Sequence, residues 1–157
     1  MNDEQEWTIL ESEPPIIDAI GNSLGRSETQ FSLANGHLGM RGDYEESQPA
    51  WHRGTYVNGF HETEPIVYGE QAYGFARDHQ TMLNLPDGRL IRLFIDGQEF
   101  TMAEGRCHAY RRSLDMRRGQ LVRQLEWELP NGRRFALEVR RLVSFVRPEL
   151  AAITWTG

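Results

Sequence analysis

The segment QLVRQLEWELPNGRRFALEVRRLVSF (residues 120–145) alternates between apolar and polar side chains with a period of two. That period is typical of a β-strand with one buried face, and Asn131-Gly132 is a strong hairpin turn signal. We therefore predict an antiparallel hairpin whose apolar face is core. Its arginine–glutamate face should meet water or cover the rim of another sheet. The predicted core face comprises Leu121, Leu125, Trp127, Leu129, Phe135, Leu137, Val139, Val143 and Phe145.

The rest of the chain shows short strand patterns separated by turn signals, and no long amphipathic helix. Such spacing is typical of a sandwich or barrel. The sequence therefore predicts an all-β fold, an antiparallel β-sandwich with little helix. Residues 43–53 and 66–77 are predicted to be loops, residues 11–25 to be extended or looped, and residues 113–116 to form a short turn. The further predicted strands are residues 7–10, 29–33, 37–41, 54–60, 90–95, 99–102 and 150–155.

Length and composition limit the class of protein. The chain has 157 residues, enough for one domain, and its mean hydropathy is −0.59. No apolar run approaches the ~20 residues of a membrane helix, and the acidic N-terminus lacks a signal-peptide pattern. We therefore expect a soluble, cytoplasmic protein without membrane contact. The single cysteine, Cys107, permits no intrachain disulfide and is expected to be an ordinary thiol.

Charge is unevenly distributed. The net charge is −6, with −8 in residues 1–50 and +5 in residues 101–157, and all 17 basic residues are arginine. The C-terminal arginines lie within alternating strand patterns, and no aromatic–basic platform accompanies them. We predict a charged sheet face and no nucleic-acid binding.

The stretch from Phe31 to Thr63 combines five glycines between residues 36 and 59 with aromatic and polar side chains. Glycine at this density indicates positive φ angles, bulges or close contact with another surface. We predict a surface shaped to meet a sugar or another domain. Its aromatic members are Trp51, Tyr56 and Phe60, and its polar members are Asn35, His37, Arg41, Glu45, His52, His61 and Glu62.

Three of these features have alternative readings. The pair His61-Glu62 could satisfy loop amides at a strand end, or contact a sugar or a neighbouring domain. Arg41 could pin the glycine-rich loop through a carboxylate, or dock another domain in the same way. Trp51 and Tyr56 could stack on sugar rings or belong to the core.

Neither metal binding nor independent catalysis is predicted. The histidines fit no compact ligand motif, and no His-Glu-x-x-His motif occurs. Adjacent carboxylates such as Glu45-Glu46 would point to opposite sides of a strand. We therefore expect no catalytic residue, metal or cofactor in this chain.

Six motifs occur along the chain: ANGHLGMRG (residues 34–42), GTYVNGFHE (54–62), YGEQAYGFA (68–76), LNLPDG (83–88), SLDMRRGQLVR (113–123) and RRLVSF (140–145). Together they resemble the start of family 65 glycoside phosphorylases and hydrolases. The resemblance begins near Trp7, covers most of the chain and matches only that family's N-terminal β-sandwich domain.

The resemblance implies a role in cleaving α-glucosides with phosphate or water. In that family the catalytic glutamic acid and the phosphate-binding residues lie on an (α/α)6 barrel, and no position of this chain corresponds to them. Residues 1–157 are thus expected to be one N-terminal domain, truncated before the barrel and inactive alone. Inorganic phosphate would be a co-substrate only of the full-length enzyme.

The implied partners are the catalytic barrel, α-glucosides and, through an exposed late strand, further copies of the chain. The alternative is a stand-alone carbohydrate-binding module. It would use Trp51, Tyr56 and His61 as a sugar platform.

Overall fold

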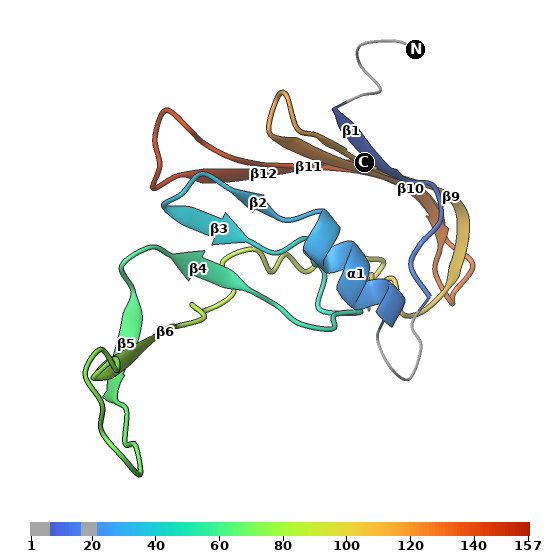
Figure 1. The fold of residues 1–157 in the computed structure, drawn as a ribbon. Coiled ribbons are helices and arrows are strands. Elements are labelled where there is room, and N and C mark those ends of the chain that lie inside the picture. Colours follow the sequence, from blue (N-terminus) through green and yellow to red (C-terminus); the bar gives the residue numbers. More distant parts are fainter. Residues whose placement is uncertain (1–6, 17–21) are drawn as a thin grey trace.

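The computed structural model describes residues 7–16 and 22–157. It contains an antiparallel five-stranded sheet in the order β1-β9-β10-β11-β12, which forms one layer of the molecule (Figure 1). The predicted hairpin is its centre, with Leu125 opposite Leu137 and Gly132 in the turn at φ +82°. The strands are β1 (Thr8–Glu11), β9 (Arg106–Asp115), β10 (Gln120–Glu128), β11 (Arg134–Val143) and β12 (Ala151–Thr156).

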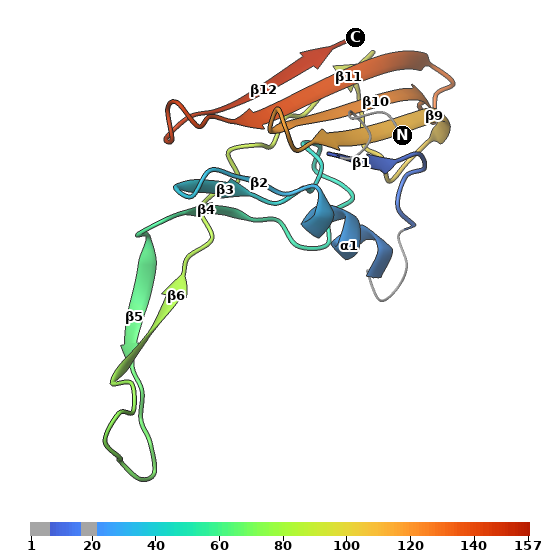
Figure 2. The same ribbon diagram turned by 45° about the horizontal axis from the view of Figure 1, so that its top comes forward.

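The second layer consists of a three-stranded sheet, a short helix and the irregular loop 41–53. The sheet has the order β2-β3-β4, and it lies with helix α1 against one side of the larger sheet (Figures 1 and 2). As predicted, Asn35-Gly36 turns the chain between β2 and β3, with Gly36 at φ +87°. The elements are α1 (Asn22–Gln30), β2 (Leu33–Ala34), β3 (Leu38–Met40) and β4 (Thr55–Val57).

Two smaller hairpins complete the fold. Strands β5 (His61–Pro65) and β6 (Asp78–Met82) form a ribbon that projects away from both layers (Figure 2), and every residue of the two strands is exposed. Strands β7 (Phe94–Ile95) and β8 (Gln98–Glu99) flank the predicted turn at residues 96–97. These elements confirm the all-β sandwich prediction.

The core has two apolar clusters separated by a row of charge. One cluster surrounds Phe100 and Trp127, whose rings pack edge to face with their centroids 6.0 Å apart. The other surrounds Phe31 and Leu121. Between them, three strands of the large sheet each direct one buried arginine inward. These residues, here called the arginine layer, are Arg112 on β9, Arg123 on β10 and Arg141 on β11.

Several local predictions were wrong. Residues 22–30 are helix, not loop and strand, because Leu24 and Phe31 pack into the two clusters. Residues 113–116 do not form a turn of their own, since the first three belong to the end of β9. Residues 61–65 form β5, with Pro65 as its last residue.

Two predictions about burial also require correction. Phe145 lies outside the core and is 75% exposed. The arginines do not all lie on an outer face: Arg134 and Arg140 do, as predicted, but the arginine layer faces the core.

Candidate functional site

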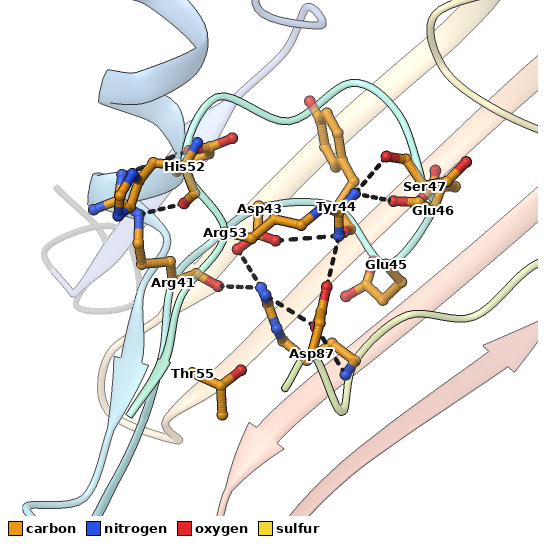
Figure 3. Close-up of polar contacts among 12 residues, drawn as sticks. Arg41, Asp43, Tyr44, Glu45, Glu46, Ser47, His52, Arg53, Thr55 and Asp87 are labelled. Atoms are coloured by element: carbon orange, nitrogen blue, oxygen red, sulfur yellow. Dashed lines mark hydrogen bonds and ion pairs between the residues drawn. The ribbon is translucent and has the colours of Figure 1, made fainter. Parts of the chain in front are cut away.

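The loop after β3 is held between the layers by buried ion pairs. Figure 3 shows the neighbouring contacts of Arg53, which donates to the carbonyl oxygens of Glu46 and Ser47 and pairs with Asp87. Both carboxylate oxygens of Glu46 accept hydrogen bonds from Arg123, at 2.6 and 2.7 Å. Glu45 accepts from Arg123 at 3.1 Å and from the Arg141 Nε at 2.9 Å. Asp43 pairs with the buried Arg89. Glu45 and Glu46, which the sequence presents as loop residues, are therefore structural anchors for the arginine layer, and Asp43 anchors Arg89.

The arginine layer also fixes the loop backbone. Arg141 donates to the carbonyl oxygens of Arg41 at 2.8 Å and Asp43 at 2.7 Å, and Arg112 donates to that of Gly42. Hydrogen bonds to charged groups contribute more than neutral ones. An irregular loop can therefore stay buried without regular backbone pairing.

The electrostatics of this cluster favour the charged form of Glu45 but disfavour that of Asp43 and Tyr44. Burial alone would raise the pKa of Glu45, but Arg141 and Arg123 outweigh it and lower that pKa to about 2. Burial dominates at Asp43 and raises its pKa despite Arg89. Burial also raises the pKa of Tyr44 to about 12, so this hydroxyl stays neutral beside Tyr110, 3.0 Å away. Glu45 therefore carries a fixed negative charge near neutral pH and is not a proton donor there.

Arg41, Trp51 and Tyr56 come together at the end of the small sheet. The Arg41 Nε donates to the His52 carbonyl oxygen at 2.9 Å, and its terminal nitrogen lies 3.5 Å from the buried Glu28 carboxylate. Glu28 also accepts from the backbone nitrogens of Trp51 and His52, at 2.6 and 2.8 Å. Arg41 thus has the loop-pinning role that the sequence analysis considered.

The glycines beside this cluster allow close contacts. A Cβ atom on Gly25 would lie 2.8 Å from the Trp51 ring, and one on Gly54 would lie 2.6 Å from Tyr56 and 2.8 Å from Arg41. Trp51 is nevertheless 55% exposed. Gly39 pairs with Tyr56 across the strands and lies on the face opposite the core. These residues form a glycine-floored face on the outside of the small sheet.

Asn35 and His37 lie at the other end of the small sheet, at the tip of the β2–β3 hairpin. The Asn35 amide donates to the carbonyl oxygens of Ser144 and Pro148, at 2.6 and 2.9 Å, and its own oxygen caps the His37 and Leu38 backbone nitrogens. Asn35 therefore joins the small sheet to the β11–β12 connection. The side chain of His37 is exposed.

His61 and Glu62 open the projecting ribbon, as part of β5. They pair with Met82 and Thr81 on β6, and both side chains are exposed. The predicted site residues thus fall into three places and do not converge on one pocket. Among the residues that the structure describes, no group of three or more metal-binding side chains is found.

Gly42 supplies a sharp test of the loop's packing. Replacing Gly42 with alanine should destabilise the chain by about 1–3 kcal/mol, because the new Cβ would lie 2.6 Å from the Phe31 carbonyl carbon and 2.7 Å from its Cβ. Gly39→Ala is the matched control, since its Cβ meets only Ala34 at 3.7 Å. Urea unfolding of both variants measures the difference, and equal stabilities would contradict the close packing.

The arginine layer was not predicted, although the sequence contains a pattern that indicates it. Arg112, Arg123 and Arg141 lie in phase with the apolar residues of their strands, as in Leu121-x-Arg123-x-Leu125. An inward charge needs a partner, and the acids at 43, 45 and 46 offered the matching sign. The alternation showed which face of the sheet each side chain occupies. It did not show that arginines on the core face form ion pairs with the acids at 45 and 46.

Comparison with known proteins agrees with this architecture. Residues 20–156 match the model of the glycosyl hydrolase family 65 N-terminal domain. The chain belongs to glycosyl hydrolase family 65. Within this family it is 44% identical over 156 residues to an alpha,alpha-trehalose phosphorylase of Thermoanaerobacter brockii, covering 97% of this chain and 20% of the relative. It is 32% identical over 147 residues to a kojibiose phosphorylase of Halothermothrix orenii, covering 94% of this chain and 17% of the relative.

A solved structure from the human microbiome, assigned as a kojibiose phosphorylase, shares the fold of this family 65 domain. The TM-score is 0.79 at 24% identity, over 98% of this chain and 20% of that one. The chain therefore spans about a fifth of the length of the relatives it matches.

Proposed function

We propose that residues 1–157 form a docking domain of a family 65 α-glucoside phosphorylase or hydrolase, beside a catalytic barrel contributed by other residues of the enzyme. The domain supports the barrel and is inactive alone. The observation that carries this proposal is the family match, which is confined to the N-terminal domain of relatives about five times longer.

The geometry of the polar residues supports a structural role. Arg41, Asn35, Glu45 and Glu46 are each tied to backbone groups or to buried charges. A general acid needs a carboxyl whose pKa lies near the working pH. Glu45, whose pKa is lowered to about 2, does not have that property.

Two surfaces support docking. The first is the glycine-floored face around the half-buried Gly39 and Tyr56, where the missing side chain of Gly39 permits close backbone approach. The second is the ribbon, because an isolated two-stranded hairpin is at best marginally stable in water. Its loop exposes Val67 at 92% and Tyr73 fully. A contact surface with another domain explains both.

An activity assay tests the proposal. The purified chain should release no glucose or glucose 1-phosphate from trehalose, kojibiose or maltose, with or without inorganic phosphate. Activity that scales with chain concentration and co-elutes with the chain on gel filtration would contradict the inactive role.

The ribbon gives a second test. Replacing Val67 and Tyr73 together with serine should change the unfolding free energy of the isolated chain by no more than about 0.5 kcal/mol, because neither side chain is buried. Urea titration of both proteins measures this. A loss above about 1 kcal/mol would show that these side chains pack within the chain and would remove them from the docking surface.

The alternative is a carbohydrate-binding module. The exposed Trp51 ring favours it, since aromatic faces can stack on sugars. Trp51 and Tyr56 share one end of the small sheet, whereas His61 belongs to the ribbon. NMR titration with maltose, trehalose and glucose distinguishes a binding module from a docking domain. Chemical-shift changes at Trp51 and Tyr56 that saturate at millimolar sugar would favour sugar binding, and unchanged spectra would favour docking.

Within the described residues, no helix is both long and apolar enough to cross a bilayer. A cytoplasmic location, self-association and an α-glucoside ligand stay predictions.

A further inference from the structure

We propose that a hollow on the open face of the five-stranded sheet binds an organic phosphate of about the size of a sugar phosphate. This face is opposite the one that packs on the second layer, since Arg111, Ser113 and Asp115 alternate along β9 with the inward Tyr110, Arg112 and Leu114. The hollow has a volume of about 340 Å³. Its lining comprises Trp7, Thr8, Arg111, Ser113, Asp115, Arg117, Arg118, Gln120, Val122 and Arg140.

The lining concentrates positive charge in an acidic protein. Four arginines and one aspartate line the hollow, whereas the whole chain carries a net charge of −6. The arginines come from β9, the β9–β10 turn and β11. Strand pairing places Ser113 and Arg140 on either side of Val122, so short side chains lie between the cationic ones. This arrangement leaves room for a ligand among the guanidinium groups.

Some guanidinium groups of the hollow have N–H donors that are free to bind a ligand. Among the described residues, the side chain of Arg111 makes no hydrogen bond or ion pair. Arg140 donates through its Nε to Glu138 at 2.6 Å, while its two terminal nitrogens have no hydrogen-bond partner in the described part of the chain. The Arg118 backbone nitrogen donates to Asp115 at 3.0 Å, whereas its guanidinium approaches Asp115 only through Nε, at 3.7 Å. An arginine fork matches the oxygens of a phosphate in a bidentate manner.

The rest of the lining suits the organic part of such a ligand. Trp7 is 47% exposed and offers an aromatic surface, while Ser113 and Gln120 provide hydroxyl and amide groups. Inorganic phosphate alone would leave most of the volume empty. A phosphate ester with a hydroxylated ring would use the cations, the polar groups and the indole together.

This site is independent of the proposed docking role. The glycine-floored face belongs to the second layer, and the ribbon points away from the large sheet (Figure 2). Ligand binding in the hollow therefore needs only the residues of this chain, and its absence would leave the docking proposal intact.

Calorimetric titration of the full 157-residue chain with glucose 1-phosphate tests the inference. We expect saturable binding, weaker binding of inorganic phosphate and none of glucose. Binding should weaken between about 50 and 300 mM NaCl, because ionic contacts at a surface are screened. Glucose binding as tightly as its phosphate, or no saturable binding of the phosphate ester, would overturn the proposal.

Paired variants locate the site. The double substitution Arg111→Gln and Arg140→Gln should weaken glucose 1-phosphate binding by at least about tenfold, since two charge-assisted contacts are lost. The control Arg92→Gln with Arg133→Gln removes the same charge from exposed, ion-paired arginines outside the hollow, and should change affinity by less than about twofold. Circular dichroism confirms that each variant is folded. Equal weakening in both pairs would show only a net-charge effect and overturn the assigned site.

Discussion

Replacing Arg123 with methionine should lower the unfolding free energy by about 3–5 kcal/mol, because the change leaves buried carboxylates without their cation. Arg123 is 2% exposed and makes both hydrogen bonds to the Glu46 carboxylate, which is fully buried. It also donates to Glu45. Because methionine fills a similar volume without a charge, the loss of unfolding free energy comes mainly from the broken ion pairs and less from a cavity. Urea unfolding at pH 7 measures it.

A matched surface change serves as the control. Arg134→Met breaks an ion pair with Glu128, but its side chain is 68% exposed, so the expected loss is below about 1 kcal/mol. Adding Glu46→Gln to the Arg123 variant should recover part of the stability, since the uncompensated charge is removed. An Arg123→Met loss no larger than that of Arg134→Met would contradict the buried cluster.

Acid should unfold the domain as Glu45 becomes protonated. The pKa of this carboxyl is about 2 in the folded chain against an ordinary 4.5, because Arg141 and Arg123 stabilise its charge more than burial opposes it. A depressed folded pKa contributes stability above the unfolded pKa, and the contribution is lost as pH falls from about 4.5 to 2. The difference corresponds to about 3 kcal/mol. Asp43, whose pKa is raised, acts in the opposite direction.

Urea midpoints measured between pH 7 and pH 2.5 test this dependence. Glu45→Gln should be less stable at pH 7 and lose less stability on acidification than the parent chain. Glu99→Gln is the control: the pKa of this exposed carboxyl is lowered by a hydrogen bond from Arg92, and solvent screens the pair. An unchanged pH slope in the Glu45 variant would mean that other carboxyls control acid unfolding.

The sequence predicted those parts of the fold that depend on local pattern. Alternation over residues 120–145 and the Asn-Gly turns correctly placed the central hairpin and the β2–β3 turn. Helix α1 was missed because its nine residues, NSLGRSETQ, carry a single large apolar side chain, Leu24. The helix is stabilised by the tertiary contacts of Leu24 and Phe31. These contacts leave no periodic apolar pattern in the sequence from which the helix could be predicted.

The candidate site was predictable only in part. The glycine-rich stretch does bring Arg41, Trp51 and Tyr56 together. The separation of His61 and Glu62 onto a projecting ribbon depends on pairing with residues 78–82, a contact that strand propensity did not indicate. Whether a polar residue lies at a surface or in a buried network depends on distant partners, as Glu46 and Arg123 show across 77 positions.

The row of guanidinium groups between the two apolar clusters also bears on how the sheet aligns during folding. A two-residue slip between β10 and β11 would keep the inward leucines and valines, such as Leu125 and Leu137, directed inward, so hydrophobicity alone tolerates it. The same slip would move Arg123 or Arg141 away from Glu45 and Glu46 and towards aliphatic neighbours. Misaligned hairpins are thus penalised by unpaired charge, and a single strand alignment is selected.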